Sequence, residues 1–244
     1  MLPNVVVIGA MKSGTTSLRH YLSAHPRIAL APGGLNFFIE ERNWNKGLAW
    51  YESHFDADAD VFCDASPRYA NFPIHQGVAA RMADLIPGAR LLYLVRHPID
   101  RLVSHYCHAV AKGEERRAFS DAFPDLEVSP YVVRGLYATQ IEEFARHYPM
   151  SQIHVLLHED LRHRRRQTMR EVFEFIGVDD TIESPAFAEM LHRTEDKRRP
   201  EDQGGGPVSR PEVPGPLRRR LWKVFRPEVE RLGEIMGRPL SWCA

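Results

Sequence analysis

The chain has few cysteines and no pattern that would make them ligands or bridges. Its 244 residues include only Cys63, Cys107 and Cys243, an odd number without the spacing of a metal site. A disulfide framework or a zinc site would need paired, regularly spaced cysteines. The pattern therefore indicates incidental thiols in a reducing compartment.

Long apolar runs and an excess of one charge are also absent. No apolar run approaches the roughly 18 residues that a membrane-spanning helix requires. The N-terminus enters a strand directly, which leaves no room for a signal peptide. Lys and Arg number 32 and Asp and Glu number 32, so the composition does not favour nucleic acid as a partner. We expect a soluble, cytoplasmic protein without a membrane span; the oligomeric state is left open.

The most informative stretch of the chain is 4–25. Four β-branched residues, Val5–Ile8, predict a strand buried on both faces of a parallel sheet. Gly9 and Gly14 bound a short loop, and helical spacing begins at Thr15. Free amide groups converge where a strand passes through a glycine loop into a helix, and the helix dipole favours negative charge there. The stretch therefore predicts an anion site.

The loop also carries polar side chains suited to a phosphate-like group. Lys12 supplies a mobile cation, and hydroxyl donors come from Ser13, Thr15, Thr16 and Ser17. The glycines match a nucleotide-hydrolysing P-loop, G-x-x-x-x-G-K-[ST], but Thr15 stands in the lysine position. A Mg²⁺-dependent P-loop enzyme also needs an acidic residue after a neighbouring strand. The best such strand, 91–95, runs instead into Arg96, which suggests a second phosphate held without metal.

Two segments together resemble a known family. The sequence KSGTTS at 12–17 resembles the 5′-phosphosulfate loop of sulfotransferases that use 3′-phosphoadenosine-5′-phosphosulfate (PAPS). The sequence RHPIDRLVSHY at 96–106 is similar to their 3′-phosphate motif, with Ser104 eight residues after Arg96. Weaker likenesses extend to the C-terminus. Within the family, the chain resembles bacterial and carbohydrate (heparan-sulfate-type) members.

The resemblance implies an enzyme that moves a sulfuryl group from PAPS to a hydroxyl or amine. The acceptor would be a small molecule, a carbohydrate or a glycolipid, the product would be PAP, and no metal would be required. Lys12 would be catalytic, neutralising charge on the bridging oxygen of the leaving phosphate. Segment 190–215 would be a mobile lid. The expected cofactor-binding residues are Lys12, Ser13, Gly14, Thr15, Thr16, Ser17, Arg96, Ser104, Lys197 and Arg198.

The general base is missing from its usual place. Carbohydrate-type relatives often carry Lys-Glu two residues before Phe-Phe, and this chain has Gly33 and Gly34 there. Asp64, at the end of a predicted strand, is the first candidate for the base, because the carboxyl ends of parallel strands face the ligand. It could equally cap the turn that begins at Ser66. Residues 40 and 41, both glutamates, are the next candidates.

The order of strands and helices predicts one α/β domain over 1–244, a P-loop-like, doubly wound and mostly parallel sheet flanked by helices. Two other functions stay open. One is an ATP-dependent kinase with a degenerate P-loop, which would require Mg²⁺. The other is a nucleotide-binding protein that kept the pocket and lost catalysis, an alternative that Gly33 and Gly34 support.

Overall fold

The computed structural model describes residues 1–189, 198–203 and 205–243. The chain folds into two compact units. Unit 1 comprises Met1–Val95 and Gln140–Met190, and unit 2 comprises Arg96–Thr139 and Leu191–Ala244. Each unit is considered by itself below. The expectation that 1–244 forms a single sulfotransferase domain stays a prediction.

Unit 1 is built on a parallel sheet of five strands. Along the sheet the order is β2-β3-β1-β4-β5, and every pairing of neighbouring strands is parallel. This confirms the predicted doubly wound sheet. The strands are β1 (Val5–Gly9), β2 (Ile28–Leu30), β3 (Val61–Ala65), β4 (Arg90–Val95) and β5 (Ile153–Leu157).

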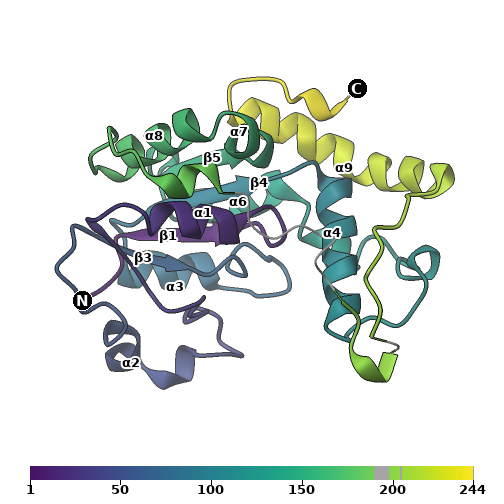
Figure 1. Ribbon diagram of the computed structural model, residues 1–244, viewed down its shortest axis with the longest axis horizontal. Helices are drawn as coiled ribbons and strands as arrows, with labels where there is room; N and C mark the ends of the chain where they lie inside the picture. Colours follow the sequence, from purple (N-terminus) through teal and green to yellow (C-terminus); the bar gives the residue numbers. More distant parts are fainter. Residues whose placement is uncertain (190–197, 204, 244) are drawn as a thin grey trace. The chain divides into compact units, whose positions relative to one another are not determined.

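The central strands β1 and β3 are buried along their whole length, and β4 is buried after its first residue, Arg90, as their β-branched and leucine-rich sequences predict. All residues of β1 and β3 are buried. Alternate side chains of a strand point to opposite faces, so Val5 and Val7 pack on one face with Leu92 and Leu94 of β4. That face is covered by α1, α7 and α8, which lie on the same side of the sheet, and α3 lies on the other side (Figure 1).

The helices of unit 1 can be compared with the apolar spacing of the sequence. That spacing predicts a helix at 75–86, and the observed helix begins at Val78, after Gly77, which has a φ of 70°. It also predicts a helix at 135–148, and the observed helix is Tyr137–Ala145. The helices of unit 1 are α1 (Thr15–Leu22), α2 (Leu48–Glu52), α3 (Val78–Leu85), most of α6 (Tyr137–Ala145), α7 (His158–His163) and α8 (Arg165–Ile176).

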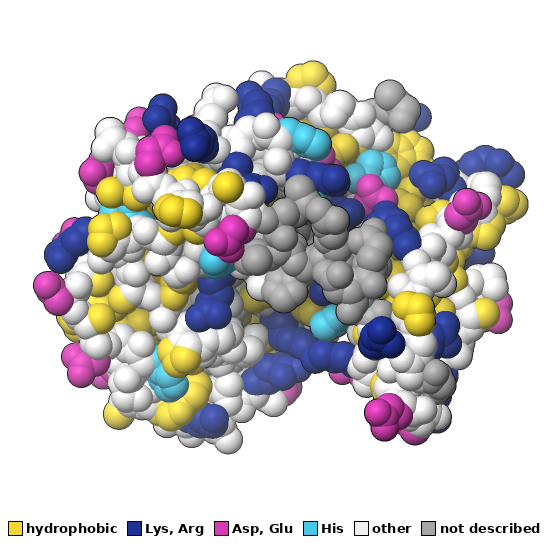
Figure 2. All heavy atoms as spheres, in the orientation of Figure 1, with side chains coloured by type: hydrophobic (Ala, Val, Ile, Leu, Met, Phe, Trp, Pro, Cys, Tyr) yellow, Lys and Arg dark blue, Asp and Glu magenta, His cyan; other side chains and the backbone are white. Residues whose placement is uncertain are grey.

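Unit 2 is helical and has its own apolar core. Its helices are α4 (Pro98–Ala111), α5 (Pro130–Val133) and α9 (Gly215–Ile235), and α6 begins in it. The core joins one face of α4 to Leu221 and Phe225 of α9 and to Phe119 and Phe123 of the segment before α5. At the beginning of α9 the side chains of 218–220, three arginines, are exposed. Figure 2 shows basic side chains gathered at that end of the helix.

The expected lid falls partly outside the described residues, including Lys197. Its described part is tied to the rest of unit 2. Arg198 forms an isolated antiparallel bridge with Pro207, Val208 is buried in the core of the unit, and Arg210 forms an ion pair with Asp100. Mobility of this segment stays a prediction. None of the helices among the described residues is long and apolar enough to cross a membrane.

Candidate donor-nucleotide site

The loop between β1 and α1 has the backbone of an anion site. Ala10 N donates to Leu94 O at 2.7 Å, which ties the start of the loop to β4. The first helical hydrogen bond runs from Leu18 N to Gly14 O at 3.0 Å. The amides of residues 15–17 come before Leu18 in the chain, so they have no carbonyl partner within the helix. They lie at the end of β1 where the helix dipole is positive.

Two residues of this loop adopt left-handed backbone conformations. Gly14, the residue before α1, has a φ of 102°, and Lys12 has a φ of 70°. A lysine pays a steric cost for this conformation, so the loop geometry is imposed by its surroundings. Because such strain is concentrated at functional sites, the backbone of Lys12 supports the role that the sequence suggests for its side chain.

Ser13, a residue of this loop, has a fully buried side chain. Its hydroxyl has no hydrogen-bond partner among the described residues. A buried hydroxyl without a partner costs free energy unless a ligand satisfies it. Thr15 is also buried, whereas Thr16 is exposed and Ser17 is half-buried. The set of donors in this loop therefore fits a phosphate or sulfate oxygen.

His158, the first residue of α7, packs against this loop and was missed by the sequence analysis. A Cβ atom at Gly14 would lie 2.7 Å from His158 Nδ1. Glycine at position 14 thus serves both the positive φ and this close approach. The signal that could have found the histidine is its place directly after β5, at the sheet edge where ligands bind in such folds.

Asp64 is a fully buried carboxylate that organises the neighbouring loop. Its Oδ1 accepts from Ser66 Oγ at 2.5 Å and from Leu35 N at 3.4 Å. Its Oδ2 accepts from Tyr69 OH at 2.7 Å and from Tyr51 OH at 3.0 Å. Burial raises the pKa of Asp64, although these hydrogen bonds oppose the shift, and burial beside Asp64 raises the pKa of both tyrosines.

The four donors occupy the lone-pair sites of the Asp64 carboxylate. Two of these donors also accept from backbone amides of the loop: Ser66 Oγ from Asn36 N at 2.9 Å, and Tyr69 OH from Phe37 N at 2.9 Å. The geometry therefore favours the structural alternative for Asp64, broadened from a turn cap to a support for 35–37. The role of general base stays untested.

Gly34 occupies a position where this backbone has no space for a side chain. A Cβ atom there would lie 2.9 Å from the carbonyl oxygen of Ala65 and 3.5 Å from Ser66. A glutamate at this place would require the backbone to shift. The other candidates for the base have partners at the surface. Glu40 forms an ion pair with Arg81 at 3.5 Å, and a carboxylate oxygen of Glu41 lies 3.4 Å from His75 Nδ1.

Unit 2 holds the residues expected to bind a 3′-phosphate. Arg96 is half-buried and directly follows β4 in the chain, and its carbonyl accepts from the hydroxyl of the buried Tyr137 at 2.8 Å. Ser104 is 6% exposed on α4. Asp100, in the first turn of α4, forms an ion pair with Arg210.

Arg198 is exposed, and no hydrogen bond or ion pair is described for its side chain. The basic run at 162–166 is structural or solvated, as its composition suggests: Arg165 donates to Phe187 O at 2.5 Å, Arg164 pairs with Asp160 at 3.1 Å and Arg166 pairs with Glu183 at 3.5 Å. None of these observations tests the cofactor role of Arg198.

Comparison with known proteins identifies the family. The family model described as "Sulfotransferase domain" matches residues 2–196, and the chain belongs to this family. The resemblance carried by residues 12–17 and 96–106 is thereby confirmed.

Curated relatives include the heparan sulfate glucosamine 3-O-sulfotransferases 3A1 of Mus musculus and 6 of Homo sapiens. They are 25% and 26% identical to this chain over 99% and 98% of its length. The chain spans 64% of the mouse relative and 73% of the human one.

Solved structures show the same fold. A sulfotransferase from Alicyclobacillus acidocaldarius superposes with a TM-score of 0.81 at 27% identity, covering 100% of both chains. A mouse sulfotransferase solved with PAP superposes with a TM-score of 0.58 at 14% identity, covering 93% of this chain and 84% of that one. The expected P-loop-like architecture is confirmed.

Proposed function

We propose that this protein transfers the sulfuryl group of PAPS to a hydroxyl or amine of an acceptor and releases PAP. The observation that carries the proposal is the loop between β1 and α1. It combines a buried hydroxyl without a described partner at Ser13, a left-handed glycine at Gly14 and a strained lysine at Lys12. Family membership supports the same reaction class.

The residues divide the work between chemistry and recognition. Lys12 neutralises the charge that develops on the oxygen between sulfur and phosphorus as that bond breaks, and the amides of 14–16 hold the adjacent oxygens. The amide of Ser13 already donates to Ala10 O at 3.1 Å, so Ser13 contributes its hydroxyl. Arg96 and Ser104 hold the 3′-phosphate and so select this donor over nucleotides that lack it. PAPS supplies the activated sulfuryl group. The protein aligns acceptor and donor, as in phosphoryl transfer.

The acceptor is proposed to be a carbohydrate, a glycolipid or another small molecule. Curated relatives named for glucosamine 3-O-sulfation in heparan sulfate support a sugar hydroxyl. We further propose that no metal takes part, that the site lies in a bacterial, cytoplasmic enzyme, and that Lys197 and Arg198 approach the cofactor. Cys63 and Cys107 are free, buried thiols.

A second candidate function is a nucleotide-binding protein without catalysis. The contact between Gly34 and Ala65 O favours it, because the usual position of the base cannot carry a side chain in this backbone. The kinase alternative has less support. Asp64, the acidic residue on the strand beside β1, is engaged by four protein donors and presents no oxygen to a metal.

Ligand binding and turnover separate these functions. PAP should raise the melting temperature without Mg²⁺ and should bind at least about tenfold more tightly than 5′-AMP, since one charge-assisted phosphate contact is worth about 1.5–3 kcal/mol. Arg96→Ala should remove most of that preference. Turnover of PAPS with a mixed acceptor panel distinguishes the enzyme from the binder. Equal affinities for PAP and AMP in the unmodified protein would reject the assignment.

A further inference from the structure

Unit 2 contains a pocket of about 400 Å³ that lies apart from the residues assigned to the 3′-phosphate. The volume is in the lower part of the range of small-molecule sites. Tyr106 and Val110 line it from α4, one helical turn apart and therefore on one face. Ser104 points to the other side of the same helix. The pocket therefore uses a different face of α4 from the proposed nucleotide contact.

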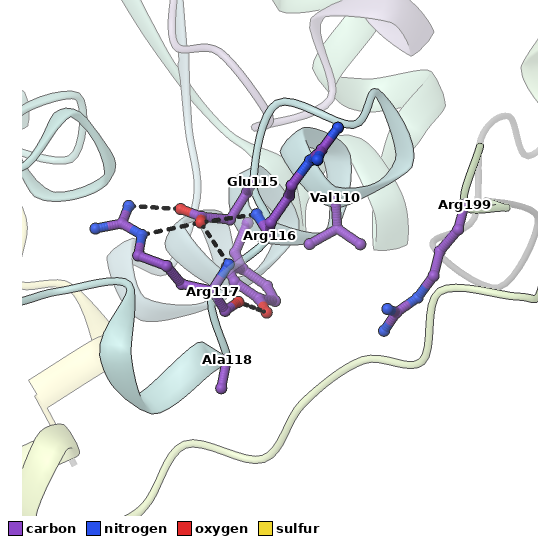
Figure 3. Close-up of a pocket in the computed structure, with 7 residues that line it drawn as sticks. Val110, Glu115, Arg116, Arg117, Ala118 and Arg199 are labelled. Atoms are coloured by element: carbon purple, nitrogen blue, oxygen red, sulfur yellow. Dashed lines mark hydrogen bonds and ion pairs between the residues drawn. The ribbon is translucent and has the colours of Figure 1, made fainter. Parts of the chain in front are cut away.

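The charged lining of the pocket is mainly basic. Arg116, Arg117 and Arg199 stand against one carboxylate, Glu115, which leaves a formal excess of two positive charges. Arg199 reaches the pocket from a segment separate from the loop that carries the other three (Figure 3). Among the described residues Arg199 forms no ion pair. Arg116 pairs with Asp202 at 3.8 Å between exposed side chains, an arrangement that contributes little.

Glu115 is buried in the wall of the pocket, and protein donors engage both of its carboxylate oxygens. It is 5% exposed and accepts from Arg117 Nη2 at 2.6 Å, from Arg117 Nε at 2.9 Å and from Tyr131 OH at 3.1 Å. The amides of Arg116 and Arg117 donate to it at 3.0 and 2.9 Å. Hydrogen bonds from Arg117 lower the pKa of Glu115 to about 2.

The loop at 115–117 is also fixed from the side of α4. Tyr106 OH donates to Arg117 O at 2.8 Å, and Glu115 N donates to Ala109 O at 3.3 Å. The backbone of the wall is thus held before any ligand arrives, which reduces the entropy lost on binding. With Glu115 neutralising Arg117, the charge offered to a ligand comes from Arg116 and Arg199.

We propose that this pocket binds the anionic group of a sugar-sized ligand: a sulfate ester, a phosphate ester or a carboxylate. Guanidinium groups recognise such oxyanions through paired hydrogen bonds. Tyr106 and Val110 supply the apolar surface against which a ring can pack. This inference rests on unit 2 alone and does not depend on the proposed transfer reaction.

The test is calorimetric titration with glucose 6-sulfate, glucose and inorganic sulfate at low ionic strength. Glucose 6-sulfate should bind at least about tenfold more tightly than glucose. Arg116→Ala and Arg199→Ala should each weaken it about threefold to tenfold, and added salt should weaken it further. Arg166→Ala, a similarly exposed arginine in unit 1, and Lys12→Ala should leave it unchanged.

Two further comparisons decide the assignment. Inorganic sulfate that binds as tightly as glucose 6-sulfate supports a free anion as the ligand, and weaker binding supports an anionic sugar. Equal binding of glucose and glucose 6-sulfate would overturn the proposal. A loss of glucose 6-sulfate binding in Lys12→Ala would also overturn it. The same holds if Arg116→Ala and Arg199→Ala lower the affinity for PAP as much as the affinity for glucose 6-sulfate. Both arginine side chains are at the surface, so we expect the melting temperatures of the two variants to be unchanged. Unchanged values exclude misfolding as the cause of weaker binding.

Discussion

The sites proposed in the two units differ in how they would present positive charge to a ligand. In unit 1 the loop of β1 and α1 relies on backbone amides, a glycine at positive φ and one lysine. In unit 2 the charge would come from side chains, Arg96 in the proposed nucleotide motif and Arg116 and Arg199 in the pocket. A backbone site is rigid and suits the atoms that react, whereas guanidinium groups suit recognition. Changes in unit 1 should therefore affect rate and folding, and changes in unit 2 should affect affinity.

The largest effect is expected at Lys12. Lys12→Ala should reduce sulfuryl transfer about a hundredfold or more, the scale for one preorganised charge at a developing oxyanion, while PAP affinity changes far less because the loop amides remain. Lys12→Gly is the control. It should lose the same rate and be more stable than Lys12→Ala by about 1 kcal/mol, because glycine relieves the φ of 70°. More than a tenth of the normal rate, with chemistry rate-limiting, would contradict this role.

The next effect concerns the packing of Gly14 against His158. Gly14→Ala should lower the free energy of unfolding by about 2–3 kcal/mol, combining the cost of alanine at positive φ with the 2.7 Å contact. Gly33→Ala is a matched control, because Gly33 has a φ of 74° and open space around it. It should cost only about 1 kcal/mol. Denaturant titration measures both, and equal losses would show that His158 does not constrain the loop.

Asp64 tests whether unit 1 uses its buried carboxylate for structure or for proton transfer. Because burial raises the pKa of Asp64, the folded protein holds this proton at a pH where the unfolded chain has released it. Stability should therefore fall as the pH rises from about 4 through the raised pKa. Asp64→Asn should remove that part of the pH dependence.

The pH–rate profile separates the two roles of Asp64. A positioning role predicts that Asp64→Asn keeps the shape of the profile and loses rate modestly, since the amide oxygen still accepts from Leu35 N. A general base predicts a loss of about 10²-fold and of the acidic limb. A variant with that loss and normal stability would favour proton transfer over the hydrogen-bonded support described here.

The parts of the molecule that depend on local sequence were predictable. The β-branched run at Val5–Ile8 and the glycine spacing place the strand, the loop and the helix start within one residue of their observed bounds. Contacts between distant segments were not. Nothing near Asp64 in the sequence announces Tyr51 as a donor. Nor does the sequence around Gly34 reveal that its close contact, the carbonyl oxygen of Ala65, lies on β3.

The pocket of unit 2 shows the same limit. Arg116 and Arg199 are 83 positions apart by their numbers, and each looks like a solvated surface residue in its own segment. The sequence also does not predict that Glu115 is buried and fixes the wall, because only the fold brings Tyr131 to its oxygens together with Arg117. The balanced composition implies that any anion site must arise from local clustering of basic residues, but only the tertiary structure shows where they cluster.

The smallest effect is expected at Tyr137, which sharpens the division between folding and affinity inside unit 2. Its buried hydroxyl donates to Arg96 O at 2.8 Å, so Tyr137→Phe leaves that carbonyl without this donor and should cost about 0.5–1.5 kcal/mol of stability. Looser placement of Arg96 should also lower the ratio of PAP to 5′-AMP affinity by about threefold, equivalent to about 0.7 kcal/mol.

Tyr148→Phe in unit 1 is the matched control, because the buried Tyr148 hydroxyl donates to another carbonyl, Ile86 O, at 3.1 Å. It should cost similar stability and leave the PAP to AMP ratio unchanged. Titrating both nucleotides into both variants separates the effects. If the ratio falls equally in the two variants, the loss reflects general destabilisation, and Tyr137 has no particular part in positioning Arg96. If it falls only in Tyr137→Phe, the hydroxyl of a core tyrosine sets the position of Arg96, the residue proposed to bind the 3′-phosphate.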